Sequence, residues 1–530
     1  MLFKGNIHSY IYIIGLALLA ASVPTSVFMM SVSQFIILGN WLLEGDFKTK
    51  WKRLMQHKSA LLFISIFFIH LIWLFPPQDY HYAFNDIRIK LPIFILPLLV
   101  VTSKPISNKE LKYILYSFVA SVTVVSFIIL YRYIFRVQLG ITDYRELSPF
   151  ISHIRYSLMV VFSIFIIASQ FKVKEKSKTA TLLWIIVSVY LILLLFIIRA
   201  NTGIIVFAIM LILSFLYYLK KVRPLFKIAG TAIILAGLIS FCLYTLHIWN
   251  SFISASELLP PSSTVKTPNG NPYTFLSENK DVENGERVWF FIQEDEMRKE
   301  WNNRSTLPYD DKDKKNNDLK YTLVRYLSSK GLTKDSLGIS QLSQEDISAI
   351  ENSIANYTYT KQFSIYTIIY KFLWEFYSYR NYKDANGQSF IQRIVYAQTA
   401  ISIIKKHFFF GVGTGNVQQA FNQEYSQQKK LLDKKYWLRA HNQYLTFLLT
   451  FGIFGFLWIC FSFLYPFFKN LNGNKFVSLI FLSIALISFV NEDMLETQAG
   501  VTFIVLFYVL FAFGNRKELT ESTPLPPITN

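Results

Sequence analysis

Four arginines and one histidine beside apolar runs carry the strongest chemical signal in this sequence: Arg88, Arg155, Arg199, Arg393 and His441. Arginine presents a planar fork of donors that matches phosphate oxygens, and a neutral imidazole can accept a proton from a hydroxyl. Taken singly, each arginine is better explained as a side chain that reaches lipid headgroups or pairs with a carboxylate. Taken together, the set favours a site for a membrane-anchored phosphate or diphosphate.

Arg393 has a helical setting that predicts a distant partner. At about 100° per residue it shares a helix stripe with Ala397, Ala400 and Ile404. None of these neighbours offers an anion. We therefore expect the partner of the Arg393 guanidinium to come from elsewhere in the chain or from a ligand.

His441 and Asn442 stand directly before an apolar run over 443–468. Because the positive end of a helix dipole disfavours a charged imidazolium, His441 is expected to be neutral. A neutral imidazole there is a candidate base for a sugar hydroxyl, with Asn442 beside it as a candidate binding residue. Considered alone, such a histidine is more often an interfacial polar cap.

The segment Gly411-Val412-Gly413-Thr414-Gly415 has glycines at alternate positions. Gly411, Gly413 and Gly415 can let backbone N–H groups approach an anion, although a tight turn is the commoner cause of such a pattern. The segment is not a dinucleotide fingerprint, because no strand precedes it and the spacing differs.

Metal and thiol chemistry find little support. Asp311-Lys312-Asp313 has the spacing of metal-binding pairs in nucleotide-sugar enzymes, but it lies among lysines and asparagines, which favours a solvated turn. The histidines are scattered without metal-ligand spacing. Cys242 and Cys460 each lie inside an apolar run, so no disulfide framework is expected. We expect no catalytic metal and no other cofactor.

The elements that must position these residues are membrane helices. The 530 residues are 52% hydrophobic and only 16% charged, against about 25% charged in soluble domains. Continuous apolar runs of about 17–25 residues match the bilayer thickness and argue against barrel strands. We predict an all-α polytopic membrane protein with about twelve transmembrane helices. These lie over 8–22, 26–43, 59–75, 89–102, 111–131, 154–171, 180–198, 203–219, 226–246, 443–468, 476–491 and 498–514.

Lysine and arginine counts in the short loops predict the orientation. With the N-terminus in the cytoplasm, the inside loops carry about three times as many Lys and Arg as the short outside loops. This topology explains the net charge of +19 without nucleic acid. Met1–Phe28 is expected to remain as the first span rather than to be a cleaved signal. The arginines named above then fall at the outer boundary, where basic residues oppose the usual bias and need a purpose.

The predicted domains follow from the spans. Helices one to nine occupy 1–247, a large loop on the outer side occupies 248–440, helices ten to twelve occupy 441–514, and a cytoplasmic tail occupies 515–530. The loop contains a polar insertion over 255–385 and an arginine helix with the glycine-rich turn over 389–415.

Two capping boxes predict helices in the mostly helical loop. Ser343 with Asp346 opens one helix, and Ser389 with Gln392 opens a second that runs to about Lys406. The aromatic-rich stretch 361–380 has the composition of a segment that lies along a membrane surface.

Residues 389–455 resemble the O-antigen ligase and O-antigen polymerase family. The resemblance rests on Arg393, the G-V-G-x-G turn at 411–415, His441-Asn442-Gln443-Tyr444-Leu445 and the G-x-x-G at 452–455. The segments Asp86-Ile87-Arg88-Ile89-Lys90-Leu91-Pro92 and Asn491-Glu492-Asp493-Met494-Leu495-Glu496 are also similar to family segments. The family's Ser-Arg pattern after the seventh span is replaced here by Arg199-Ala200-Asn201-Thr202-Gly203, and the stretch 255–385 is unusually long.

The resemblance implies a metal-independent, inverting glycosyltransferase with a GT-C-like fold in the bacterial inner membrane, its large loop in the periplasm. Its donor would be an undecaprenyl-diphosphate-linked glycan, and its acceptor a hydroxyl on lipid A–core or on a growing glycan chain. By this likeness His441 activates the acceptor, and Arg393 and Arg88 hold the diphosphate, with Arg155 and Arg199 as further candidates.

Other functions stay open at this stage. A glycan polymerase and a protein O-glycan ligase share the chemistry and differ only in the acceptor. A polysaccharide transporter or flippase would need ionisable residues near mid-membrane, for which His70 is the main candidate. A non-catalytic assembly scaffold would use the soluble segment to recruit partners.

Overall fold

A computed structural model describes residues 2–74, 79–141, 143–171, 177–219, 223–258, 265–361, 364–427, 432–471 and 474–515. The predicted tail from Arg516 onward, including Lys517, lies outside the described residues, as do Lys172, Lys174 and Lys176 of one predicted inside loop and Lys220 and Lys221 of another. The chain forms two compact units. One contains residues 1–222 and 393–530, and the other contains residues 223–392. This division differs from the expected boundaries at 248 and 440, because the helix after 223 groups with the loop and residues 393–440 group with the membrane helices.

The first unit is a bundle of apolar helices. Its N-terminal part contains α1 (Leu2–Ser22), α2 (Val27–Glu44), α3 (Phe47–Gln56), α4 (Lys58–Ile72), α5 (Tyr80–Thr102), α6 (Asn108–Ile134), η1 (Tyr144–Leu147), α7 (His153–Gln170), α8 (Lys178–Ile197) and α9 (Asn201–Tyr218). Its C-terminal part contains α16 (Ser389–Lys406), which begins in the other unit, α17 (Val417–Gln427), η4 (Lys434–Tyr436), α18 (Gln443–Lys469), α19 (Lys475–Asn491), η5 (Met494–Glu496), α20 (Gln498–Val509) and η6 (Leu510–Gly514).

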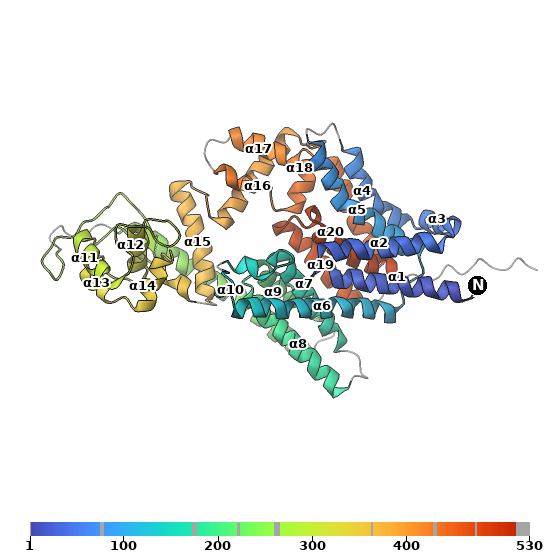
Figure 1. The fold of residues 1–530 in the computed structure, drawn as a ribbon, viewed down its shortest axis with the longest axis horizontal. Coiled ribbons are helices and arrows are strands. Elements are labelled where there is room, and N and C mark those ends of the chain that lie inside the picture. Colours follow the sequence, from blue (N-terminus) through green and yellow to red (C-terminus); the bar gives the residue numbers. More distant parts are fainter. Residues whose placement is uncertain are drawn as a thin grey trace, which may run out of the picture. The chain divides into compact units, whose positions relative to one another are not determined.

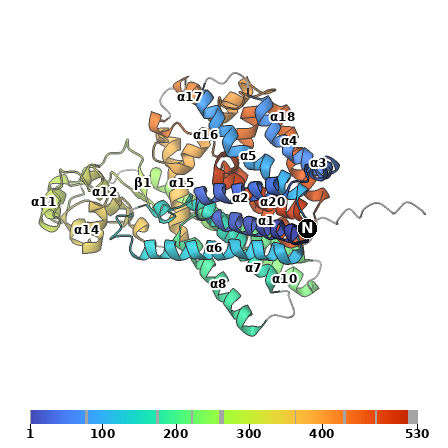
Figure 2. The same cartoon turned by 45° about the vertical axis from the view of Figure 1, so that its right-hand side comes forward.

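Helix α20 lies in the centre of this bundle. Its side chains are apolar all round, and those from Ala499 to Val509 are buried. A helix without a polar face must be covered on every side, and α5 and α19 are among the helices that pack on it. Farther from the centre, α1 and α2 lie side by side, as Figures 1 and 2 both show, and α6 packs on α1.

Every predicted span falls on a helix of the structure. Among the described residues, seven helices are long and apolar enough to cross a membrane, or eight when the pair α3–α4, bent by 92°, counts as one span. Three shorter apolar helices, Ile7–Ser22, Lys475–Asn491 and Gln498–Gly514, and the proline-containing α5 cover the remaining predictions. The chain is therefore a polytopic helical membrane protein, while the total of twelve spans stays a prediction.

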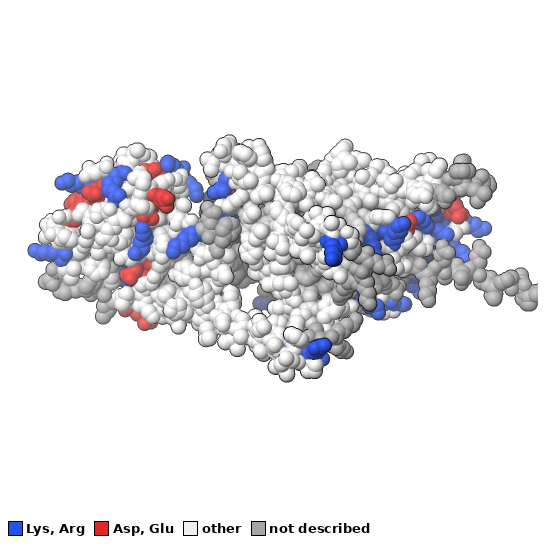
Figure 3. Space-filling model, turned by 90° about the horizontal axis from the view of Figure 1, so that it is seen from below, with Lys and Arg blue, Asp and Glu red and all other residues white. Residues whose placement is uncertain are grey.

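The second unit combines one long apolar helix with a polar domain. It contains α10 (Pro224–Ser256), β1 (Val282–Glu283), β2 (Glu286–Arg287), α11 (Glu294–Arg304), α12 (Leu319–Ser329), α13 (Ser336–Ser340), α14 (Gln344–Glu351), η3 (Tyr357–Thr360) and α15 (Ile365–Tyr382). Helices α11 to α14 surround a small core that includes Trp301, Leu323 and Ile350. On the face that Figure 3 shows, acidic and basic side chains intermingle over this domain, whereas most of the visible surface of the helical bundle is uncharged.

Both capping-box predictions lead to helices. Ser343 accepts from the Asp346 N–H while the Asp346 carboxylate accepts from the Ser343 N–H, and α14 follows. Helix α16 covers the predicted 389–406. The aromatic-rich stretch forms α15, which packs against the end of α10 through Tyr370 and Tyr377.

Candidate functional site

The site is organised around an acidic segment, Asn491–Glu496, between α19 and α20. Helix α19 ends at Asn491, Glu492 is extended, and Met494–Glu496 form a single 3-10 turn. Glu492 and Asp493 are buried at 5% and 4% exposure, and the Glu496 side chain at 6%. Because a buried carboxylate is costly unless it is paired, this segment must draw cations from other helices.

Two arginines converge on Glu492. Arg155 of α7 places Nη2 3.4 Å from one carboxylate oxygen, and Arg393 of α16 places Nη2 3.5 Å from the other. Arg393 also donates to the backbone carbonyl of Asn491 at 3.0 Å and to its side-chain oxygen. The Asn491 amide in turn donates to the Thr202 hydroxyl at the start of α9. Four helices thus meet at this point, and the expectation that the partner of Arg393 comes from elsewhere in the chain is confirmed.

The Glu492 pairs leave donors unused. Contacts of 3.4–3.5 Å are longer than the usual 2.7–2.9 Å of charge-assisted hydrogen bonds. Within the described part of the chain, the buried Nε of Arg155 has no hydrogen-bond partner. The Arg393 side chain is 31% exposed. Arg393 is therefore accessible to a further anion, and Arg155 has hydrogen-bonding capacity that Glu492 does not use.

A second cluster surrounds Glu496. Lys90 of α5 donates to Glu496 at 2.9 Å and to Asp86 at 2.5 Å. Arg439 lies 3.3 Å from the same Glu496 oxygen, and the Gln443 amide donates to the other at 3.1 Å. Although burial raises the pKa of Glu496, Lys90 and Arg439 bring it below its usual value. This carboxylate is fully engaged.

Asp493 lies between Glu492 and Glu496 in the acidic segment that joins the two clusters. Burial, opposed in part by Arg439 and reinforced by Glu496, raises the pKa of Asp493 to about 6. The Thr446 hydroxyl donates to this carboxylate at 3.1 Å. Burial likewise raises the pKa of Glu492, while Arg155 and Arg393 lower it.

His441 lies in the loop directly before α18. Its backbone is left-handed, with φ 48°, and Asn442 caps α18 by accepting from the Leu445 N–H at 3.0 Å. The half-buried imidazole packs against the ring of Tyr396, with centroids 5.8 Å apart. In the described part of the chain it has no hydrogen-bond partner, so its ring nitrogens are open to a ligand.

The imidazole is neutral near pH 7. Burial, followed by the positive charges of Arg393, Arg439 and Arg155, lowers the pKa of His441 to about 4. The sequence predicted a neutral histidine from the helix dipole; the structure gives the same charge state from burial and three guanidiniums. All three guanidiniums are therefore close enough to the ring to act on its charge state.

Arg88 is not brought into this arrangement. It is exposed, and it donates to Asn85 on its own helix at 2.7 Å. Asp86 and Lys90 share one face of α5. Arg88, midway between them in sequence, lies about 160–200° around the helix axis from both and so faces the opposite side. Lys90 is therefore the α5 cation that meets the acidic segment, in place of the expected Arg88.

Arg199 occupies the corner between α8 and α9. Its backbone is left-handed, with φ 53°, and its guanidinium carbon lies 3.9 Å from the centroid of the Tyr144 ring. From this corner, the Thr202 hydroxyl accepts a hydrogen bond from the Asn491 amide of the acidic segment. Gly203 lets α9 approach α7 closely, since a Cβ there would come within 2.5 Å of the Ser157 side chain.

The glycine-rich turn Gly411–Gly415 has a structural role. The N–H groups of Val412 and Gly413 donate to the carbonyls of Leu449 and Thr450, each at 2.9 Å. The N–H groups of Gly411 and Thr414 are also bonded to backbone carbonyls, and Gly415 is buried. These donors are thus not presented to an anion, in contrast to the binding role expected for Gly411, Gly413 and Gly415.

A break in α18 explains why this turn needs glycine. Gly452 has φ 64° within the helix, and the Gly411 segment lies against the carbonyls freed there. A Cβ on Gly411 would come within 2.3 Å of the Thr450 carbonyl oxygen, and one on Gly452 within 2.2 Å of the Phe409 carbonyl oxygen. Only glycine fits at either position, so the turn and the break hold the first half of α18, and with it His441, in place.

The candidate histidine for transport has an ordinary packed environment. His70 is buried, its Nδ1 bonds to the Ile66 carbonyl at 2.8 Å, and its ring meets Phe451 edge-on at 4.7 Å. His70 is thus packed in the bundle interior, although its buried Nε2 has no hydrogen-bond partner among the described residues.

Residues 346–460 match the family model described as O-antigen ligase. The matched stretch includes Arg393, the glycine-rich turn and His441-Asn442, and it ends within α18. A search of curated proteins found no match. The resemblance predicted from the sequence is confirmed, and with it a ligase- or polymerase-type function. Over residues 346–460 the chain is similar to the O-antigen ligase family.

Proposed function

We propose that this protein is a glycosyltransferase that moves a glycan from undecaprenyl diphosphate to an acceptor hydroxyl, with lipid A–core as the first acceptor to test. One observation carries the proposal. Arg155 and Arg393 share Glu492 through long contacts that leave guanidinium donors unused, and both lower the pKa of His441. The neutral His441 imidazole has no hydrogen-bond partner in the described chain. Guanidinium forks suit diphosphate oxygens, and an open imidazole suits a hydroxyl.

The reaction is a single in-line displacement. The bond between the anomeric carbon and the diphosphate oxygen breaks while the acceptor oxygen bonds to that carbon from the opposite side, which inverts the configuration. The acceptor proton passes to a ring nitrogen of His441 and then to solvent. The departing lipid diphosphate gains negative charge, which Arg155 and Arg393 stabilise.

Binding of the donor would change the pKa of His441, the proposed base of the reaction. A base with a pKa near 4 is weak at neutral pH, and a base works best when its pKa lies near the operating pH. Diphosphate charges beside Arg155 and Arg393 would offset the guanidinium field that acts on the imidazole. The pKa of His441 would then rise toward its ordinary value only in the complex.

The cations near the acidic segment supply the positive charge that a metal ion often gives such reactions. We therefore propose a metal-independent reaction, in which transfer by the purified protein is unchanged by EDTA. The proposed orientation has both termini in the cytoplasm of a bacterial inner membrane and the polar domain of α11–α14 in the periplasm. The loop asymmetry in Lys and Arg supports this orientation.

A reconstituted assay tests the proposal. The purified protein is given an undecaprenyl-diphosphate glycan and either lipid A–core, free glycan or a Ser/Thr-containing peptide. Arg393→Gln and Arg155→Gln should each raise the KM for the donor, and the double variant should abolish transfer. Transfer at the wild-type rate by the double variant would contradict the proposed site, and transfer to free glycan alone would assign a polymerase.

A further inference from the structure

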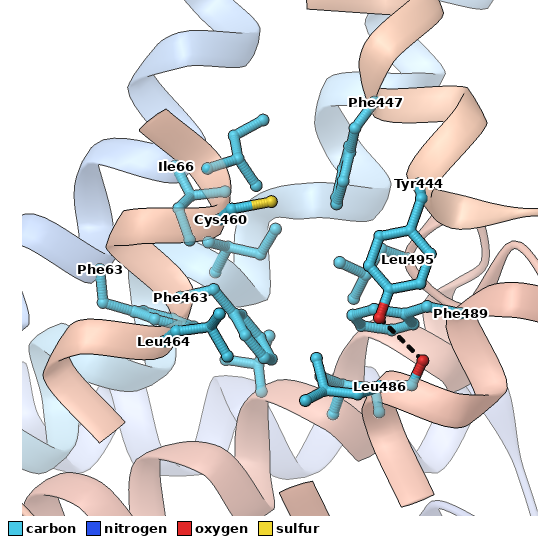
Figure 4. Close-up of a pocket in the computed structure, with 14 residues that line it drawn as sticks. Phe63, Ile66, Tyr444, Phe447, Cys460, Phe463, Leu464, Leu486, Phe489 and Leu495 are labelled. Carbon is cyan, nitrogen blue, oxygen red and sulfur yellow. Dashed lines mark hydrogen bonds between the residues drawn. The ribbon is translucent and has the colours of Figure 1, made fainter. Parts of the chain in front are cut away.

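An apolar cavity lies in the first unit between α4, α5, α18, α19 and α20 (Figure 4). Its volume is about 190 Å³. The lining consists of aliphatic and aromatic side chains, the thiol of Cys460 and the hydroxyl of Tyr444, which already donates to the Leu486 carbonyl at 2.8 Å. A water molecule needs two to four polar partners, and apolar cavities of about 150 Å³ stay dry and bind benzene. The cavity therefore suits hydrocarbon.

One end of the cavity adjoins the charged site. Leu495 lines the cavity and belongs to the acidic segment, where its N–H donates to the Gln443 side chain at 2.8 Å. Leu495 follows Glu492 by three positions, a backbone reach of at most about 11 Å. Tyr444, which also lines the cavity, follows His441 by three residues (Figure 4).

The other end continues into an open groove along α18. Cys460 and Leu464 line both the cavity and this groove, whose further lining is Phe461, Tyr465, Phe468 and Lys469. The rings of Phe461, Tyr465 and Phe468 recur at helical spacing and are 44–54% exposed. From Tyr444 to Lys469 the helix covers about 37 Å, close to the ~30 Å hydrocarbon thickness of a bilayer. Cavity and groove thus form one apolar path along α18.

We propose that this path, the α18 channel, binds the isoprenoid chain of the lipid diphosphate donor. In a polyprenyl diphosphate the first isoprene unit is bonded directly to the phosphate. The hydrocarbon chain therefore begins next to the group that the guanidiniums bind. In a glycolipid acceptor, sugars separate the reacting hydroxyl from the acyl chains, which need not enter a cavity beside the charged segment. The inference rests on the proposed function for the identity of the donor.

The Cys460 thiol gives a direct test, because it lines both parts of the channel. Cys242→Ser leaves Cys460 as the sole cysteine. The rate of Cys460 alkylation by N-ethylmaleimide is measured with undecaprenyl diphosphate, with inorganic pyrophosphate and with lipid A. Undecaprenyl diphosphate should slow alkylation at least fivefold, and the other two should not. Equal rates at a concentration that inhibits transfer would overturn the inference, and protection by lipid A alone would assign the channel to the acceptor.

Transfer assays on the same preparation separate the two proposals. Transfer without Cys460 protection would leave the function intact and reject the channel, whereas protection without transfer to any acceptor would retain the channel and reject the function.

A narrowed channel gives a second readout. Cys460→Phe should raise the KM for an undecaprenyl-linked donor about tenfold, with little effect on a donor that carries a two- or three-isoprene chain. Leu457→Phe adds bulk to an exposed position of α18 that lines neither cavity nor groove, and should leave both KM values unchanged. Equal KM changes for long and short donors in Cys460→Phe would contradict the inference.

Discussion

The clusters around Glu492 and Glu496 lie four residues apart and use the same chemistry differently. The Lys90 side chain at Glu496 is 2% exposed, its contacts are 2.5–2.9 Å, and Arg439 and Gln443 complete the shell. At Glu492 the contacts are 3.4–3.5 Å, and Arg393 is 31% exposed. A closed shell stabilises a fold, whereas a loose shell with spare donors can exchange an internal carboxylate for a ligand. The first cluster is therefore assigned to structure and the second to binding.

Among the single substitutions, removing the imidazole should give the largest effect on activity. His441→Ala is expected to lower kcat about 10²–10⁴-fold, because the acceptor hydroxyl loses its base. Binding of undecaprenyl diphosphate should change less than twofold, since the arginines remain. The measurements are initial transfer rates and donor affinity in detergent.

The matched control is His407→Ala, which removes an exposed histidine that follows α16 and should leave kcat unchanged. A normal kcat for His441→Ala would remove the catalytic distinction between the clusters.

Opening the closed shell should give the largest effect on stability. Lys90→Met leaves Asp86 and Glu496 without their shared cation, and loss of one partner from a buried pair costs about 3–5 kcal/mol. The expected result is a marked fall in thermal stability, or loss of folded protein, by thermal unfolding in detergent.

Arg88→Met makes a similar change on the exposed side of the same helix, and its effect on stability should stay within about 0.5 kcal/mol. The double variant Lys90→Met with Glu496→Gln should recover part of the loss, because one unpaired charge disappears. Equal stability of Lys90→Met and wild type would show that the shell around Glu496 is not structural.

The predicted and observed sites differ where the prediction required knowing which face of a helix turns toward the interior of the bundle. Apolar runs predicted the membrane helices, and capping boxes predicted α14 and the beginning of α16. Both signals are local, so they can be seen in the sequence. Whether Arg88 or Lys90 of α5 turns inward depends on which neighbours cover each face, and Lys90 alone was hidden inside an apolar run. The paired glycines Gly411 and Gly452 are likewise far apart in sequence, so the close approach that requires them was invisible in either segment.

The carboxylate of the loose shell should compete with the donor. Glu492→Gln removes the charge that Arg155 and Arg393 share, and should tighten undecaprenyl diphosphate binding by roughly 2- to 10-fold, as expected for a partly exposed ion pair. Equilibrium binding at constant salt measures this. Glu496→Gln is the counterpart in the closed shell, and should reduce stability without a gain in affinity. A loss of stability with no tighter binding in Glu492→Gln would mean that both carboxylates are structural.

The smallest expected effect is in the pH profile, and it tests whether the guanidiniums act on the imidazole. A base works when deprotonated, so activity falls as pH drops through its pKa. With the pKa of His441 near 4 in the free protein, kcat/KM should stay nearly flat from about pH 7 to pH 5, where an ordinary histidine would be mostly protonated. In the pH profile of kcat, the fall in activity at acidic pH should occur at a higher pH than in the profile of kcat/KM, because the bound diphosphate raises the pKa of His441.

Other titrating groups could distort this profile, and the donor and Asp493 can each be excluded as the source of a limb. A diphosphate esterified at both ends has no proton that titrates in this range, so the donor contributes no limb. Asp493, whose pKa is about 6, does titrate there, and Asp493→Asn removes it while keeping an acceptor for the Thr446 hydroxyl. A limb of kcat/KM near pH 6.5 that persists in Asp493→Asn would place the imidazole outside the guanidinium field. The loose shell would then lack the electrostatic coupling that distinguishes it from the closed one.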